Sequence, residues 1–234
     1  MRGCFSVLVL AALFIAVGAW FGGPPIASAI VSTALAGSGL QSSDLDVRVE
    51  ADPPLLVAVG RADRVEIDAS DVEWNGLGAR SLDLVLEDVD LLGRTAGRVE
   101  GRMIGAELPE IDPPGSLARI EFAGPADGAA TTITIDAPTA EAVVAAAFEN
   151  ALGIQPDDVT FSEPDVLSLQ TGGVRVSGAM SVAPDGSVGI ATPLGTVTII
   201  SADPGQPVHL EDVDVEDGGL VLTGTLDVEG LLQG

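Results

Sequence analysis

Hydrophobic and polar residues alternate through most of the chain beyond residue 40, and this alternation predicts β-strands. Leu82, Leu84 and Leu86 would share one face of a strand, while Asp83 and Glu87 would share the other. A period of two is typical of a half-buried antiparallel strand. The same pattern recurs at Asp46–Glu50, Arg64–Asp68, Val89–Leu91, Arg119–Phe122, Thr131–Ile135 and Asp158–Phe161, and in the pairs Leu167/Leu169, Val174/Val176, Val188/Ile190, Val197/Ile199, Val208/Leu210, Val213/Val215 and Leu220/Leu222.

Turn signals separate these strands. Asn75-Gly76 stands between two alternating segments, and Asn-Gly is the strongest short-range signal for a β-hairpin. Pro184-Asp185-Gly186 marks another turn. Pro53-Pro54 interrupts the pattern, and a short apolar run follows at Leu55–Val59. The strands are therefore expected to form an antiparallel meander.

Two segments instead carry apolar residues at helical spacing. The first covers about residues 25–37, opens on proline and closes on glycine. The second covers about residues 138–152 and has an apolar stripe along one side. Asp136 or Thr139 would cap its start, and Gly153 would cap its end.

The two helices open two similar halves, at about 24–112 and 113–234. Each half continues with a short strand and a meander, and Leu-Glu-Asp-Val-Asp stands near the end of each, at Leu86–Asp90 and Leu210–Asp214. The proline-rich residues 105–117 form the boundary. We therefore predict an internal repeat.

The pattern predicts an α+β fold in which a long antiparallel sheet, curled because strands twist, wraps around two helices. Aromatic residues are scarce and small aliphatic residues are abundant. The space between helices and sheet is then either a dry, packed core or a long apolar groove.

The first apolar run, Cys4–Phe21, carries no charge and follows Arg2. At about 1.5 Å per residue it would span about 27 Å, close to the thickness of a bilayer core. It predicts a signal anchor over residues 1–23, with a cytoplasmic N-terminus and the domain at 24–234 outside the cell membrane. The alternative is a cleaved signal peptide, because Ala27-Ser28-Ala29 and Ala34-Leu35-Ala36 resemble cleavage sites, and the protein would then be secreted.

A net charge of −25 excludes most nucleic-acid binding, because phosphates would be repelled. The acidity indicates either a solvated surface or a role in binding cations. The single cysteine, Cys4, lies within the first apolar run, so the exported part has no disulfide framework.

Catalytic and metal-binding signatures are absent from the sequence. The single histidine, His209, falls in an expected strand, where it would face solvent or a satisfied partner. Asp212–Gly218 has the acidic alternation of a calcium loop, but its glycine stands at the seventh position rather than the sixth. We therefore expect no enzyme activity, no cofactor and no metal site.

Three of the ten arginines, Arg94, Arg98 and Arg102, fall within nine residues at a spacing of four. The segment is compatible with a strand or a helix, and either would place these side chains on one side. They form either a solvated face paired with Glu100 and nearby acids, or a patch for anionic lipid headgroups.

The order of elements and several local phrases resemble the LmeA-like phospholipid-binding family of bacterial cell envelopes. The phrases are Ala34–Gly37, Val47-Arg48-Val49 with Pro53–Leu56, Val65–Ala69, Leu82–Leu86 and Gly219–Gly224. The resemblance implies an extracytoplasmic protein that binds phospholipid and assists the assembly of envelope lipids or glycolipids. It also implies an architecture similar to tubular lipid-binding folds, and it supplies no catalytic residues.

We therefore predict a membrane-tethered lipid-binding domain. Acyl chains would lie against Ile26, Ile30, Val143, Ala147 and Phe148, and Arg94, Arg98 and Arg102 would contact headgroups. The partners would be lipid and membrane, with an envelope protein as a further one. The rival prediction is a non-enzymatic structural or interaction module, and a third is a calcium-responsive acidic domain.

Overall fold

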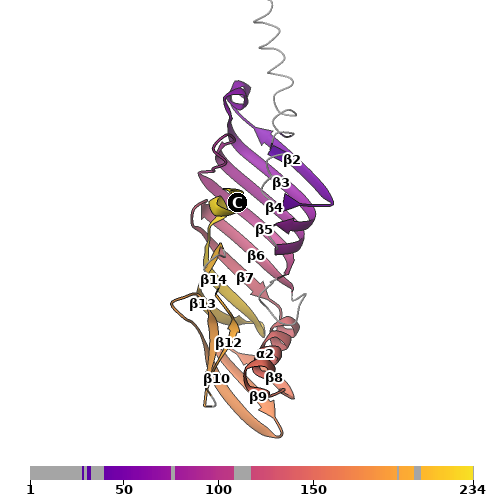
Figure 1. Cartoon of the computed structure of the whole chain (residues 1–234), viewed down its shortest axis with the longest axis vertical. Helices are drawn as coiled ribbons and strands as arrows, with labels where there is room; N and C mark the ends of the chain where they lie inside the picture. Colours follow the sequence, from indigo (N-terminus) through magenta and orange to yellow (C-terminus); the bar gives the residue numbers. More distant parts are fainter. Residues whose placement is uncertain are drawn as a thin grey trace, which may run out of the picture.

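The computed structural model describes residues 28, 31–32, 40–74, 77–107, 117–193, 195–202 and 207–233. It is an elongated, strand-rich molecule (Figure 1). The predicted anchor at 1–23 and the Asn75-Gly76 turn lie outside the described residues, as does most of the helix expected at 25–37. Within the described part, no helix combines the length and apolar character needed to cross a bilayer.

A curled antiparallel sheet forms the larger part of the molecule, as the alternation predicts. Its strand order is β1-β3-β4-β5-β6-β7-β14-β13, and β2 also pairs with β3. Trp74 lies opposite Leu77, so β3 and β4 form the expected hairpin. The strands are β1 (Leu40–Gln41), β2 (Asp44–Glu50), β3 (Arg61–Trp74), β4 (Leu77–Asp90), β5 (Arg98–Glu107), β6 (Leu117–Pro125), β7 (Ala129–Ile135), β13 (Val208–Glu216) and β14 (Gly219–Leu226).

A second antiparallel sheet lies toward the other end of the long axis (Figure 1). Its order is β12-β11-β10-β9-β8. The α-helix α2 (Ala137–Leu152) packs against β8, β12 and β14, so it touches both sheets. The strands are β8 (Asp158–Ser162), β9 (Val166–Thr171), β10 (Val174–Val182), β11 (Val188–Thr192) and β12 (Gly195–Ile200).

The ends of α2 follow the sequence signals. Asp136 is extended and its Oδ1 accepts a hydrogen bond from the Thr139 N–H at 3.0 Å, so Asp136 is the N-cap. Gly153 adopts the left-handed conformation, and its N–H donates to the Glu149 carbonyl. Phe148, Val143 and Val144 are buried from this helix.

Two short helices complete the described part. The 3-10 helix η1 (Pro54–Val59) occupies the apolar run after Pro53, and it ends at Gly60, whose φ is 79°. The helix α3 (Val228–Gln233) begins where the Val228 N–H donates to the Ala126 carbonyl at 2.9 Å. The η1 helix lies at one end of the long axis (Figure 1).

The large sheet bends along a row of backbone irregularities that crosses three strands. Asp71 on β3 and Gly105 on β5 have φ values of 47° and 64°, and Arg80 of β4 lies between them. At this row the period-two alternation of each strand is interrupted, so that two residues three positions apart are both buried. The buried pairs are Ala69 and Val72, Ala79 and Leu82, and Met103 and Ala106. In all three strands the buried positions therefore switch between odd and even residue numbers at the same row. This switch bends the sheet and keeps its apolar face continuous.

Replacing Gly105 with alanine is expected to lower the free energy of unfolding by about 1–2 kcal/mol, because a Cβ disfavours the left-handed conformation. The added Cβ would also lie 2.9 Å from Cγ and Cδ of Arg80. Gly128→Ala is the matched control, since no atom lies within 4 Å of its Cβ position. Urea unfolding of both variants tests this expectation, and equal midpoints would contradict it.

The two copies of the repeated pentapeptide bury residues at the same spacing but differ in their backbones. In each copy a leucine and a valine three residues apart are buried: Leu86 and Val89 in β4, Leu210 and Val213 in β13. Asp88 has a φ of 53° in the first copy, and the register of β13 shifts between Leu210 and Asp212 in the second. The internal repeat stays a prediction. β5 and β6, which flank the expected boundary at 105–117, pair within one sheet.

Candidate functional site

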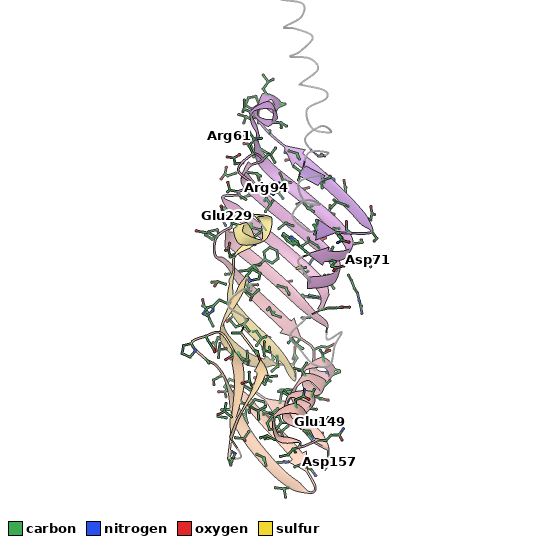
Figure 2. The ribbon with its side chains drawn as sticks, in the orientation of Figure 1. Arg61, Asp71, Arg94, Glu149, Asp157 and Glu229 are labelled. Atoms are coloured by element: carbon green, nitrogen blue, oxygen red, sulfur yellow. The ribbon has the colours of Figure 1, made fainter. Side chains whose placement is uncertain are left out.

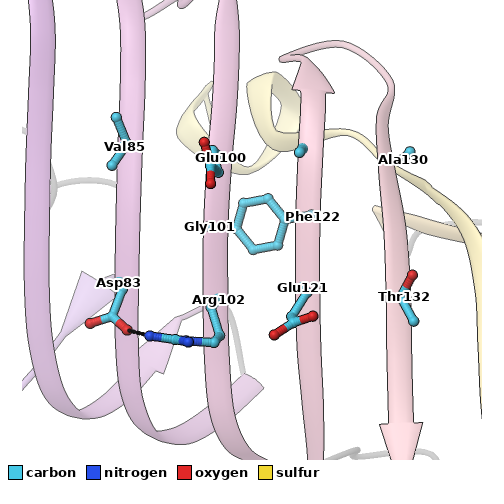
Figure 3. Close-up of a pocket in the computed structure, with 10 residues that line it drawn as sticks. Asp83, Val85, Glu100, Gly101, Arg102, Glu121, Phe122, Ala130 and Thr132 are labelled. Carbon is cyan, nitrogen blue, oxygen red and sulfur yellow. Dashed lines mark hydrogen bonds and ion pairs between the residues drawn. The ribbon is translucent and has the colours of Figure 1, made fainter.

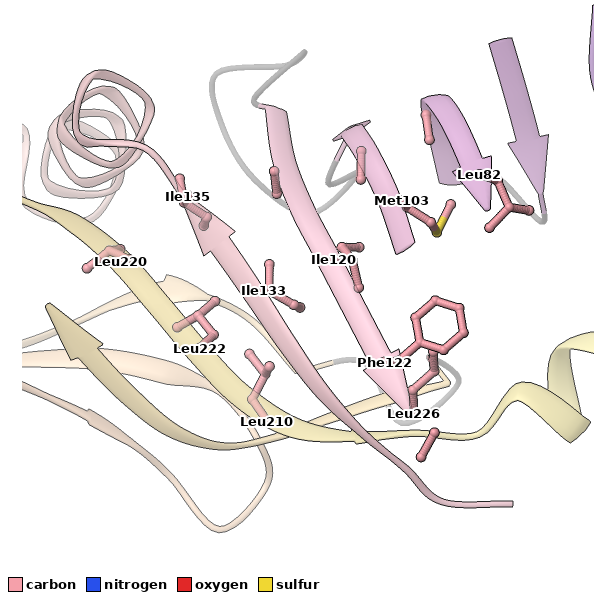
Figure 4. Close-up of a cluster of buried hydrophobic side chains, with 14 of the residues drawn as sticks. Leu82, Met103, Ile120, Phe122, Ile133, Ile135, Leu210, Leu220, Leu222 and Leu226 are labelled. Carbon is pink, nitrogen blue, oxygen red and sulfur yellow. The ribbon is translucent and has the colours of Figure 1, made fainter. Parts of the chain in front are cut away.

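One face of the large sheet, called here the inner face, is apolar and buried from β2 across to β13. Period-two alternation sends every second side chain to this side, and the residues labelled in Figure 4 follow it from β4 to β14 and β13 along the curved sheet. Its members include Val47, Val49, Val65, Ile67, Ala69, Leu82, Leu84, Leu86, Val99, Met103, Ile120, Phe122, Ile133, Ile135, Leu210, Val213, Leu220 and Leu222.

The chemistry of the inner face is that of a hydrocarbon surface. Thr131 is the buried polar residue among the described ones, and its hydroxyl donates to the Glu121 carbonyl at 3.2 Å. No carboxylate, histidine or arginine of the described part is buried there. An alkyl chain on this face would meet almost only apolar side chains, and among the described residues the face offers no acidic or basic group for proton transfer.

Gly101 makes the inner face flat at the centre of β5. It pairs with Leu84 on one side and with Phe122 on the other. The Phe122 ring leans across it and occupies the position that a Cβ would need. A glycine is required here because any side chain would displace that ring.

Trp74 gives the inner face a polar atom at the far end of β3. The indole is buried, and its Nε1 has no hydrogen-bond partner in the described structure. A buried N–H without an acceptor costs about 1–3 kcal/mol, so an oxygen atom supplied by a ligand would relieve that cost.

The outer face of the same sheet carries a ladder of alternating charges across β2, β3, β4 and β5. Arg48 contacts Asp46 at 2.6 Å, Asp68 at 3.6 Å and Glu66 at 3.7 Å. Arg64 continues the ladder to Glu66 at 2.9 Å and to Glu87 at 3.5 Å. Hydrogen bonds to Asp46 and to Glu66 raise the pKa of Arg48 and of Arg64, respectively. These cations are therefore neutralised by their neighbours.

A groove of about 510 Å³ also lies over the outer face (Figure 3). Asp83, Glu100, Glu121 and Thr132 line it, and Arg102 bridges to Asp83 at 3.0 Å. With three carboxylates and one guanidinium, the groove repels anions rather than attracting them.

The structure describes three of the five residues that were predicted to line an acyl chain. Val143 and Phe148 are fully buried and Ala147 is half-buried, all on α2. That helix packs against β8, β12 and β14, away from the β2–β5 part of the inner face. Ile26 and Ile30 lie outside the described residues. Acyl-chain contact by this set stays a prediction.

The residues predicted to contact headgroups lie on β5 and in the turn before it. Arg94 lies in the turn after β4, with a φ of 54°. Arg98 and Arg102 lie on the exposed outer face of β5, where they pair with Glu87 at 3.9 Å and Asp83 at 3.0 Å. Both partners belong to β4, not to β5 where Glu100 lies. Headgroup contact by the three arginines stays a prediction.

The remaining candidate positions show no catalytic or metal geometry. His209 is exposed on β13, as expected. Within the described ranges, no three His, Cys, Asp or Glu side chains gather as a metal site would require. Asp185 accepts hydrogen bonds from the Ser187 hydroxyl and N–H, which lower the pKa of its carboxyl in the expected turn.

Sequence reasoning located the strands of the inner face, but it took its candidate lipid-binding residues from the two expected helices. The signal was available at Leu82, Leu84 and Leu86, whose alternation marks a long apolar surface. Trp74 carried no signal, because only the structure shows its indole N–H without a partner.

Comparison with known proteins gives one match. A family model described as LmeA-like phospholipid-binding matches residues 18–225, which is most of the chain and includes every strand of the inner face except the end of β14. No curated protein and no solved structure matches.

Proposed function

The chain belongs to the LmeA-like phospholipid-binding family, and on this premise we propose that its inner face binds the acyl chains of a phospholipid. The observation that carries the proposal is the continuity of the inner face, which extends across the large sheet without a buried charge. Each buried methylene contributes about 0.8 kcal/mol, so a chain of about ten methylenes supplies useful affinity without a strong polar site.

Trp74 supports the same proposal at the polar end of the lipid. Its unpartnered Nε1–H suits an ester carbonyl oxygen, which would accept the hydrogen bond within the apolar surroundings. The binding is proposed as non-enzymatic, because Thr131, the buried polar residue among the described ones, donates to the Glu121 carbonyl and has no buried general base to activate it.

We extend the proposal to where in the cell the protein acts. The apolar run at Cys4–Phe21 supports a tether at the outer side of the cell membrane. A role in building envelope lipids is proposed as one use of the phospholipid binding that characterises the family. A short tether would keep the inner face close to the leaflet that supplies its ligand.

The experiment uses Trp74 as an internal reporter. Trp20→Phe leaves Trp74 as the sole tryptophan of the full-length chain. Loading this protein with phospholipid brominated on its acyl chains is expected to reduce Trp74 emission by at least half relative to unbrominated phospholipid. The indole is buried, so bromine in the surrounding bilayer does not contact it directly, and bound lipid is expected to be the main quencher.

Native mass spectrometry of the same protein, isolated from a membrane source, supplies the second measurement. It is expected to show bound phospholipid. Ligand-free protein together with unquenched Trp74 would reject the proposal and favour the rival function, an interaction module of the envelope.

A further inference from the structure

Three large aliphatic side chains are exposed together at the η1 end of the molecule. Leu92 is 80% exposed, Val59 64% and Leu55 47%. Leu55 and Val59 belong to η1, and Leu92 belongs to the turn between β4 and β5. We call these three residues, with Arg61 and Arg94, the tip. Figure 2 shows Arg61 and Arg94 near this end of the long axis.

Backbone hydrogen bonds and side-chain packing give the tip a defined structure. The Leu91 N–H donates to the Gly60 carbonyl at 2.7 Å, which joins the turn to η1. The Leu92 side chain fills the space that a Cβ on Gly60 would need. Asp90 Oδ1 accepts from the N–H groups of Leu92 and Gly93 at 3.0 and 2.9 Å, which holds the turn in place while the carboxylate keeps its charge.

The arginines of the tip differ from those of the charge ladder on β2 to β5, and in the described part of the chain they share their lack of an ion pair with the exposed Arg80, Arg119 and Arg175. Arg48, Arg64, Arg98 and Arg102 all pair with carboxylates there. Arg61 and Arg94 are exposed and form no ion pair within the described residues. In a chain of net charge −25, two free guanidinium groups beside exposed aliphatic side chains favour an anionic, apolar surface.

The tip is also continuous with the inner face. Val57 and Leu91 are half-buried and pack against the same core, next to buried Ala62 and Val89 at the ends of β3 and β4. An apolar path therefore leads from the exposed tip onto the inner face.

We propose that the tip contacts an anionic phospholipid bilayer, with Leu92, Val59 and Leu55 in the interface and Arg61 and Arg94 at the phosphate groups. Aliphatic side chains gain by leaving water, and each arginine near an anionic surface strengthens the contact about fivefold. The inference rests on the proposed function, because it names the surface through which the inner face receives its lipid.

The experiment reads the local surroundings of single positions, so the predicted anchor does not interfere. Leu92→Cys in a Cys4→Ser background receives a fluorophore that brightens in apolar surroundings. The full-length chain is placed in vesicles of phosphatidylcholine with 30% phosphatidylglycerol (about that fraction suffices for surface charge). Position 92 is expected to shift to the blue and brighten at least twofold.

Val174→Cys is the matched control, since Val174 is 61% exposed in β10 of the other sheet. It is expected not to respond. Arg61→Gln with Arg94→Gln should reduce the response at position 92 at least fivefold, whereas Arg175→Gln, beside Val174, should leave it unchanged.

Several outcomes would overturn the proposal. They are no response at position 92, an equal response at position 174, and a response that needs no vesicles and follows protein concentration, which would identify a second copy as the occupant. Quenching of Trp74 separates the two proposals. If position 92 does not respond but Trp74 is quenched, only the tip proposal is rejected. If position 92 responds but Trp74 is not quenched, only the lipid site is rejected.

Discussion

Replacing Ala69 with phenylalanine is expected to reduce the phospholipid recovered with the protein at least tenfold while leaving the fold intact. Ala69 lies on the inner face of β3, opposite Leu82 of β4. A phenyl ring there would occupy the space proposed for an acyl chain. If lipid fills that space, the ring replaces lipid and the protein keeps most of its stability.

The measurement is phospholipid per protein by mass spectrometry, together with urea unfolding. Ser70→Phe is the control, because Ser70 is the next residue of the same strand and is exposed on the outer face. It should retain its lipid. If side chains fill the space instead, Ala69→Phe would cost about 1–3 kcal/mol by overpacking and would leave the lipid content at the control level, against the proposal.

Replacing Phe148 with alanine is expected to lower the free energy of unfolding by about 3–5 kcal/mol, the largest change that we expect for stability. Phe148 is the largest of the fully buried side chains and lies on α2, the helix that touches both sheets. Removing the ring leaves a cavity beneath that helix. Because small domains are stable by only about 5–15 kcal/mol, the second sheet should unfold at much lower urea.

Glu149→Ala is the control for this helix, since Glu149 is exposed and precedes the same C-cap. Its effect should stay within about 0.5 kcal/mol. Circular dichroism follows the whole chain, and Trp74 emission in a Trp20→Phe background follows the large sheet alone. A Phe148→Ala protein as stable as the Glu149→Ala protein would contradict the burial of that ring.

Local patterns predicted the elements well, because each follows from a few neighbouring residues. Alternation predicted β4 through Leu82, Leu84 and Leu86, and capping residues predicted α2 through Asp136 and Gly153. The apolar run at Leu55–Val59 had no decisive pattern, and it forms η1 between Pro53 and the left-handed Gly60.

Pairing between distant segments could not be predicted in the same way. Arg98 and Arg102 have their partners on β4, because cross-strand neighbours are set by register, which alternation does not specify. The strands from β8 to β12 have the same alternation as those of the large sheet, and only the structure shows that they form a separate one.

The candidate site was predicted in its chemistry rather than in its residues. An apolar groove was one of two expectations. The residues predicted to lie against acyl chains were taken from the helices, because a helix was expected inside the sheet. The structure instead gathers the apolar surface on the strands, with Phe148 beneath α2. The aliphatic tip was also missed, since Leu55, Val59 and Leu92 become neighbours only when Gly60 meets Leu91.

The row of irregularities at Asp71, Arg80 and Gly105 bears on how such a protein evolves. Backbone conformation at this row bends the sheet, so the curvature of the inner face is set apart from the side chains that the face carries. If the inner face binds acyl chains as proposed, residues such as Leu84 and Met103 could diverge to suit saturated, branched or longer chains without changing that curvature. Lipid preference and sheet curvature would then be separately adjustable traits, one held in side chains and the other in backbone torsions.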